Sequence, residues 1–122
     1  MLLGLVSDVM AQPSSIVHQP PAALEQALIH LGGNIRTARL RRNWRLQDLA
    51  ARMGVTRFTV ADVEKGKPGT SVAAYLGALW ALGLLEQITP VADPDHDSVG
   101  RTLESARAPR VARRAALLDD DF

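Results

Sequence analysis

Four side chains near the start of one short segment have types and a spacing suited to contact with a nucleic acid. Residues 56–65 are typical of a helix capped by Thr56, and the side chains expected to point outward from its N-terminal half are Arg57, Phe58, Ala61 and Asp62. The guanidinium of Arg57 can donate two hydrogen bonds to O6 and N7 of guanine, and Phe58 can contact the thymine methyl group. These residues predict direct reading of base edges in the DNA major groove.

Asp62 fits this chemistry less readily, because a carboxylate repels the DNA phosphates. It can accept a hydrogen bond from N4 of cytosine, or it can form an ion pair with Arg57 or Lys65. Ala61 offers only apolar contact. The expected sequence preference therefore rests mainly on Arg57, and the target sequence stays open.

The spacing between Leu46 and Gly66 predicts the scaffold that would present these side chains. A short helix over 46–53 is followed by a turn, and a second helix then crosses the first at a tight angle. The small, turn-forming, capping and anchoring residues come in this order: Ala50, Gly54, Val55, Thr56, Val60, Val63 and the closing Gly66. The pattern indicates a helix-turn-helix, whose second helix directs its positive N-terminal end toward DNA.

Positive charge is concentrated around this motif. Residues 31–70 hold nine lysines and arginines against three acidic residues, whereas residues 71–97 hold four acidic residues and no basic ones. A basic block within a chain of net charge +1 is typical of a surface that faces a polyanion. A solvated helix face is the alternative explanation.

The overall composition favours a single all-helical core with terminal extensions. The 122 residues are 47% hydrophobic but only 4% aromatic, and there is no cysteine for a disulfide, a thiolate metal site or a nucleophile. The uncharged run Val72–Leu85 is shorter than the ~20 residues that a membrane span needs. We expect a soluble, cytoplasmic protein with no membrane partner.

Three parts are expected along the chain: a flexible N-terminal arm (1–21), a DNA-binding domain (22–91), and an acidic loop, short helix and tail (92–122). Pro21 can open a helix that continues toward Arg42, and the apolar residues that follow it have helical spacing. Gly32–Gly33 leaves open whether this helix is continuous or restarts near Gly33. Ser98–Arg107 is predicted to form a surface helix.

The segment after Pro68 predicts a helix that starts at Thr70 or Ser71 and ends near Gly83. Its apolar side chains lie on all faces, which favours either a central position or a shared interface. Few other elements could cover it, so we expect a homodimer, with an interface formed by Tyr75, Leu79 and Trp80. A short fifth helix is expected over Leu84–Val91.

Other chemistries fit the sequence poorly. Asp93–Asp97 resembles the start of a calcium loop, but Ser98 stands where the loop needs glycine, and Asp97 can instead cap the next helix. No two histidines have ligand spacing, no serine lies in a glycine elbow, and Gly32–Gly33 is no phosphate loop. We expect no enzyme activity, no cofactor and no metal.

The stretch Leu31–Ser71 resembles the Xre/Cro family of helix-turn-helix regulators. Within that family it is most similar to HipB-like antitoxins, through Val63–Gly66, the connector Pro68–Ser71 and the apolar helix AAYLGALWALGLL. The resemblance implies a five-helix, lambda-repressor-like domain that binds a palindromic operator as a homodimer and represses its own operon.

The resemblance also implies roles for individual residues. Arg57 and Phe58 match the positions that read bases first, with Ala61 and Asp62 one turn later on the same face. The family commonly has a basic or amide residue at the position of Asp62. The positions that touch DNA phosphates correspond to Arg45, Gln47, Thr56, Thr59 and Lys67.

Three functions remain open on the sequence. The favoured one is an antitoxin that represses its operon and binds a HipA-like kinase toxin. The second is a stand-alone Xre-type regulator, and the third is an interaction module that has lost DNA binding. The tail is expected to be solvated, or else to fold on a toxin or touch the DNA flanks, with Leu117, Leu118 and Phe122 as its apolar anchors.

Overall fold

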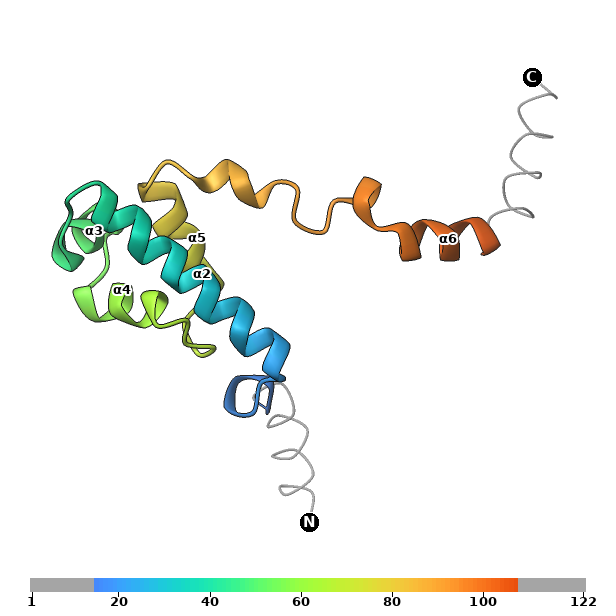
Figure 1. Ribbon diagram of the computed structural model, residues 1–122, viewed down its shortest axis with the longest axis horizontal. Coiled ribbons are helices and arrows are strands. Elements are labelled where there is room, and N and C mark those ends of the chain that lie inside the picture. The colour runs from blue at the N-terminus through green and yellow to red at the C-terminus, as the bar shows by residue number, and fades with distance from the viewer. Residues whose placement is uncertain (1–14, 108–122) are drawn as a thin grey trace, which may run out of the picture. The chain divides into compact units, whose positions relative to one another are not determined.

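A computed structural model describes residues 15–107, and within them the chain forms helices and no strands. The elements are α2 (Ala22–Arg41), α3 (Leu46–Met53), α4 (Arg57–Glu64), α5 (Val72–Ala81), the short 3₁₀ helices η1 (Leu85–Ile88) and η2 (Pro94–His96), and α6 (Ser98–Arg107). Figure 1 shows α3, α4 and α5 gathered along α2. The all-helical fold expected from the sequence is confirmed. The chain divides into two compact units between Glu86 and Gln87.

α2 is one uninterrupted helix, which settles the question left open by Gly32–Gly33. Gly32 is buried where α2 meets the end of α4, and a Cβ there would collide with the carbonyl oxygens of Val63 and Glu64. The adjacent Gly33 is exposed and has nothing within 4 Å of such a Cβ. Gly32 therefore permits a close approach of two backbones, rather than a break in the helix.

The bounds of α3 and the start of α4 agree with the predictions. Gly54 ends α3 in the left-handed conformation, with φ 72°, which glycine adopts without strain. The Thr56 hydroxyl accepts a hydrogen bond from the Thr59 N–H, so Thr56 is the predicted N-cap. Val60 and Val63 are fully buried, as expected for the two anchors of the second helix.

Gly66 closes α4 as predicted, at φ 71°. It also lies against α2, because a Cβ at this position would collide with Leu28 and Ile29 backbone atoms. Ser71 then caps α5 by accepting from the Ala74 N–H at 3.1 Å. Two glycines, Gly32 and Gly66, thus bring the C-terminal end of α4 directly onto α2.

The core of the first unit lies between α2, α3, α4 and α5. Its largest fully buried side chains are Ile35, Leu49, Val60 and Val63, one or two from each of α2, α3 and α4. α5 contributes Tyr75, Ala78 and Leu79, and Leu82 packs just beyond its end. This packing holds the helix-turn-helix as one rigid piece.

A buried ion pair joins α2 to α4. Arg39 Nε lies 2.6 Å from Glu64 Oε2 and Arg39 Nη2 lies 2.9 Å from Oε1, with both side chains almost fully buried. The hydrogen bond to Glu64 raises the pKa of Arg39 despite its burial. Counting Arg39 among the polyanion-facing charges was therefore wrong: its position four residues after Ile35 places it on the inner face of α2.

Two of the three residues expected to form a dimer interface on α5 are buried within the domain itself. Tyr75 and Leu79 are buried in the core of their own unit, so their side chains are already covered. Trp80 is 62% exposed and Val72 is 72% exposed. Of the three residues assigned to the interface, only Trp80 remains available to a second copy.

The segment after α5 differs from the short helix expected over Leu84–Val91. It contains only the four-residue 3₁₀ helix η1, which ends at Ile88. Pro90 lacks an N–H and disfavours helical backbone in the residue before it, so an α-helix does not continue there. No helix among residues 15–107 is long and apolar enough to cross a membrane.

The second unit contains the predicted helix Ser98–Arg107, which is α6. Asp97 Oδ1 accepts from the Gly100 N–H at 2.9 Å and so caps this helix, as expected. Asp93 accepts from the Asp95 N–H at the start of η2. Two carboxylates of the acidic loop therefore serve as helix caps, Asp93 for η2 and Asp97 for α6.

Part of the expected N-terminal arm is helical. Residues 15–18 form a helical turn, with the Gln19 N–H bonded to the Ser15 carbonyl at 2.8 Å. Residues 1–14 lie outside the described part of the chain. So does the tail from residue 108, including Leu117, Leu118 and Phe122.

Candidate nucleic-acid interface

The outward half of α4 presents the side chains that the sequence singled out. Arg57 is exposed and Phe58 is 68% exposed, while Ala61 and Asp62 are partly covered. The Arg57 guanidinium lies over the Phe58 ring, 5.2 Å from its centroid. The structure thus brings all four onto one surface, with a cation and an aromatic ring at the N-terminal end of the helix.

A shallow groove runs beside these residues, between the start of α3 and the start of α4. Its lining comes from Arg45, Leu46 and Gln47 on one side and from Arg57, Phe58 and Ala61 on the other. Two positions assigned to phosphates from the resemblance are therefore neighbours of three assigned to bases. Residues of the two helices lie beside one groove because the packing of the core fixes the angle at which α3 and α4 cross.

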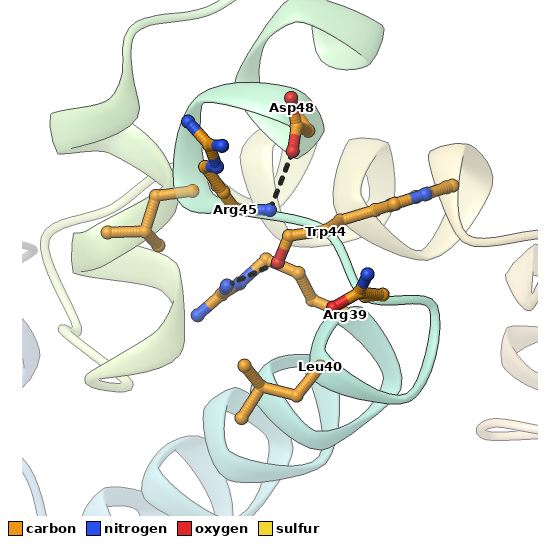
Figure 2. A pocket seen from close by; sticks show the side chains of 7 residues that line it. Arg39, Leu40, Trp44, Arg45 and Asp48 are labelled. Carbon is orange, nitrogen blue, oxygen red and sulfur yellow. Dashed lines mark hydrogen bonds between the residues drawn. The ribbon is translucent and has the colours of Figure 1, made fainter.

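The turn between α2 and α3 fixes the backbone of Arg45. The Arg45 N–H donates to Asp48 Oδ2 at 2.7 Å, and the Arg39 Nη1–H donates to the Trp44 carbonyl at 2.8 Å (Figure 2). Asn43 takes a left-handed conformation at this turn, with φ 58°. The Arg45 backbone is held from both sides, while its side chain is left exposed.

The Trp44 ring is stacked against a further cation. The guanidinium of Arg52 lies 3.9 Å from the centroid of the ring. This contact between the turn and α3 takes up one of the arginines of the basic block. It stabilises the start of the helix-turn-helix, and Arg52 does not line the groove.

Two threonines lie at the start of α4, Thr56 as its N-cap and Thr59 in its first turn. Thr56 Oγ1 caps the helix, and it also lies 3.4 Å from Thr59 Oγ1, where either hydroxyl can be the donor. Thr56 is exposed and Thr59 is partly exposed. Both hydroxyls stand next to the free amides of the helix N-terminus, which is suited to a phosphate group.

Asp62 has a partner that the sequence interpretation did not propose. Its Oδ1 lies 3.0 Å from Lys67 Nζ, and not beside Arg57 or Lys65. Asp62 does form an ion pair, as one of the two interpretations held, but its partner is Lys67. Gly66 reverses the chain just after α4, which brings Lys67 back toward the helix and explains the difference.

The basic block is smaller at the surface than in the sequence. Arg39 is buried against Glu64, Arg42 donates to the Ala38 and Leu82 carbonyls, and Lys67 is paired with Asp62. The block's other exposed cations form no ion pair with any residue in 15–107; they are Arg36, Arg41, Arg45, Arg52, Arg57 and Lys65. Only Arg45 and Arg57 line the groove.

Metal binding finds no site in the described part of the chain. No group of three or more histidine, aspartate or glutamate side chains in residues 15–107 is placed to hold a metal ion. The acidic residues at Asp93 and Asp97 are engaged as helix caps.

The sequence of residues 30–88 matches the family model described as a helix-turn-helix domain. These residues span α3, α4 and the groove, so the match and the geometry coincide. Residues 30–88 are therefore similar to a helix-turn-helix domain. No curated protein and no solved structure matched the chain. This similarity suggests a DNA-binding regulator.

Some functional contacts escaped the sequence interpretation. The Lys67 carbonyl accepts a hydrogen bond from the Tyr75 hydroxyl at 2.8 Å, across the connector between α4 and α5. Burial, followed by the nearby charge of Asp62, raises the pKa of Tyr75. The sequence could have indicated this contact, because a buried tyrosine hydroxyl on an otherwise apolar helix needs a hydrogen-bond partner.

Proposed function

We propose that this protein is a sequence-specific DNA-binding transcriptional repressor whose helix α4 enters the major groove. The groove between α3 and α4 carries the proposal, because Arg57 stands there exposed beside Phe58 and forms no ion pair with any residue in 15–107. Arg57 would read guanine, Phe58 would contact a thymine methyl group, and Ala61 would make apolar contact. Residues 22–91 would act as the DNA-binding domain.

Four further residues are proposed to hold the DNA backbone. Arg45 and Gln47 line the groove from the start of α3, and Thr56 and Thr59 flank the N-terminus of α4. Their cation, amide and hydroxyl groups can all donate hydrogen bonds to phosphate oxygens. Such contacts fix the register of a protein on the duplex and leave base discrimination to others.

A homodimer on a palindromic operator is the proposed binding unit. The exposed Trp80 and Val72, both on α5, support it, since large apolar side chains left exposed can mark an interface. Two copies related by a two-fold axis would place two α4 helices in successive major grooves.

Retardation of a duplex carrying the promoter of its own gene tests the proposal. We expect a complex at low salt whose affinity falls steeply as salt rises. Unlabelled promoter should compete better than an unrelated duplex of equal length. No retardation at low salt would overturn the repressor proposal and favour an interaction module that has lost DNA binding.

We further propose that the repressor is the antitoxin of a HipA-like kinase toxin. Support comes from the resemblance of residues 63–71 and of α5 to HipB-like antitoxins. Co-expression with a kinase-like neighbouring gene should yield a complex that co-purifies through a tag on either chain. Promoter binding without such a neighbour would favour the alternative, a stand-alone Xre-family regulator.

A further inference from the structure

An ion pair lies on the surface that is proposed to face DNA. Asp62 follows Phe58 by one helical turn, so its carboxylate shares the outward face of α4. Lys67 Nζ lies 3.0 Å from this carboxylate, and the side chains are 39% and 54% exposed for Asp62 and Lys67. An unpaired carboxylate here would repel the phosphates of an approaching duplex.

The backbone of Lys67 is fixed on both sides of its side chain. The Lys67 N–H donates to the Asp62 carbonyl at 3.1 Å, and the Lys67 carbonyl accepts from the Tyr75 hydroxyl at 2.8 Å. Tyr75 is itself buried in the core. Exposed ion pairs are usually weak because two flexible side chains must be ordered. Here the connector already directs Lys67 toward Asp62.

We propose that Lys67 acts on DNA through Asp62, by neutralising the carboxylate on the face of α4, and that Tyr75 is the positioning residue that holds Lys67 there. This inference rests on the proposed function. It replaces the direct phosphate contact that the resemblance implied for Lys67. The proposed ligand is duplex DNA. The Asp62–Lys67 pair leaves this edge of the reading face with no net charge toward the DNA phosphates.

The two roles of Lys67 differ in their dependence on Asp62. A lysine that binds a phosphate adds about 0.9 to the slope of log affinity against log salt, whatever residue 62 is. A lysine that neutralises Asp62 matters only while the carboxylate is present. A double-mutant cycle therefore separates the two roles.

The experiment measures dissociation constants of the full-length chain for its promoter duplex at several salt concentrations. The proteins are wild type, Asp62→Asn, Lys67→Gln and the double variant. Lys67→Gln alone should weaken binding by about fivefold, the effect of one charge a few ångströms from another in water. In the Asp62→Asn background, Lys67→Gln should change affinity by less than about twofold, and the double variant should keep the wild-type salt slope.

Two further variants sharpen the comparison. Lys65→Gln is the matched control, because Lys65 is an exposed lysine beside the same helix with no ion pair in the described residues. Its effect should be equal in both backgrounds. Tyr75→Phe should weaken binding in the wild-type background and have no effect in the Asp62→Asn background. Circular dichroism checks that each variant is folded.

Equal losses from Lys67→Gln in both backgrounds, with a lower salt slope each time, would overturn the inference and assign Lys67 to a phosphate. That result would leave the proposed function intact. A wild-type protein that binds no duplex would overturn the proposed function and the inference together.

Discussion

At the scale of single residues, the proposed DNA surface depends on which charges are free. Arg45 and Arg57 line the groove, whereas Arg39, Arg42 and Lys67 are engaged elsewhere. A count of basic residues therefore overstates the positive field that DNA would meet. The specificity expected for this surface comes from a few side chains in defined positions.

Titration of Tyr75 tests the arrangement around Lys67 and Asp62 in the free protein. Tyr75 is the only tyrosine of the chain, so the absorbance change at alkaline pH reports on it alone. Burial and the charge of Asp62 raise its pKa, so the midpoint should lie above the ordinary 10.0. Asp62→Asn should lower the midpoint but leave it above that value.

The same shift has a consequence for stability. A group whose pKa is raised on folding stabilises the protein below its unfolded pKa and loses that contribution as the pH rises through the folded pKa. Unfolding free energy should thus fall above pH 10 in the wild type and fall less in Tyr75→Phe. An ordinary midpoint for Tyr75, unaffected by Asp62→Asn, would contradict the placement of Asp62 near the hydroxyl.

At the scale of helices, the junction of α2 with the end of α4 positions the reading helix. Gly32 and Gly66 allow the backbones to touch, and the Arg39–Glu64 pair joins the same two helices beside them. A buried pair of this kind makes the loss of either partner costly, since the other charge is then left without compensation. The junction thus specifies one orientation of α4.

The adjacent glycines of α2 offer a matched test of this junction. Gly32→Ala should lower the free energy of unfolding by about 1–3 kcal/mol or more, because its Cβ meets two carbonyl oxygens. Gly33→Ala should raise it by about 0.5–1 kcal/mol, because alanine favours helix and the site is open. Urea unfolding followed by circular dichroism measures both, and equal effects would contradict the contact.

Local features of the sequence were enough to predict the helix-turn-helix. The ends of α3 and α4 follow from Gly54 and Thr56, whose roles depend only on the residues beside them. The contacts of Gly32, Arg39 and Lys67 were not predicted, because they depend on how distant helices meet. The helix expected over Leu84–Val91 was wrong: only the 3₁₀ helix η1 forms there, because Pro90 does not allow an α-helix to continue.

At the scale of the whole molecule, the proposed homodimer depends on which side chains of α5 are exposed. Tyr75 and Leu79 pack in the core of one copy, whereas Trp80 and Val72 are exposed on α5. The candidate DNA site is thereby separated along the sequence from the candidate dimer site. One helix-turn-helix domain would use α4 for DNA and α5 for its second copy.

Substitution of Trp80 tests this arrangement. If the proposed dimer forms through α5, Trp80→Asp should give a folded monomer, because a buried, unpaired carboxylate is costly at an interface. Val99→Asp on α6 is the control, since Val99 is 69% exposed on another helix and should leave the dimer intact. Sedimentation equilibrium gives the mass of each, and a soluble Trp80→Asp dimer would contradict the placement.

Selection of bound duplexes from a random library tests most directly whether α4 reads DNA through Arg57. The wild type should enrich a palindromic sequence. Arg57→Ala should bind it about tenfold or more weakly and lose its preference for guanine at one base pair of each half-site. Arg36→Ala, which removes an exposed arginine outside the groove, should keep the wild-type preference. An unchanged preference at every base pair in Arg57→Ala would contradict the claim.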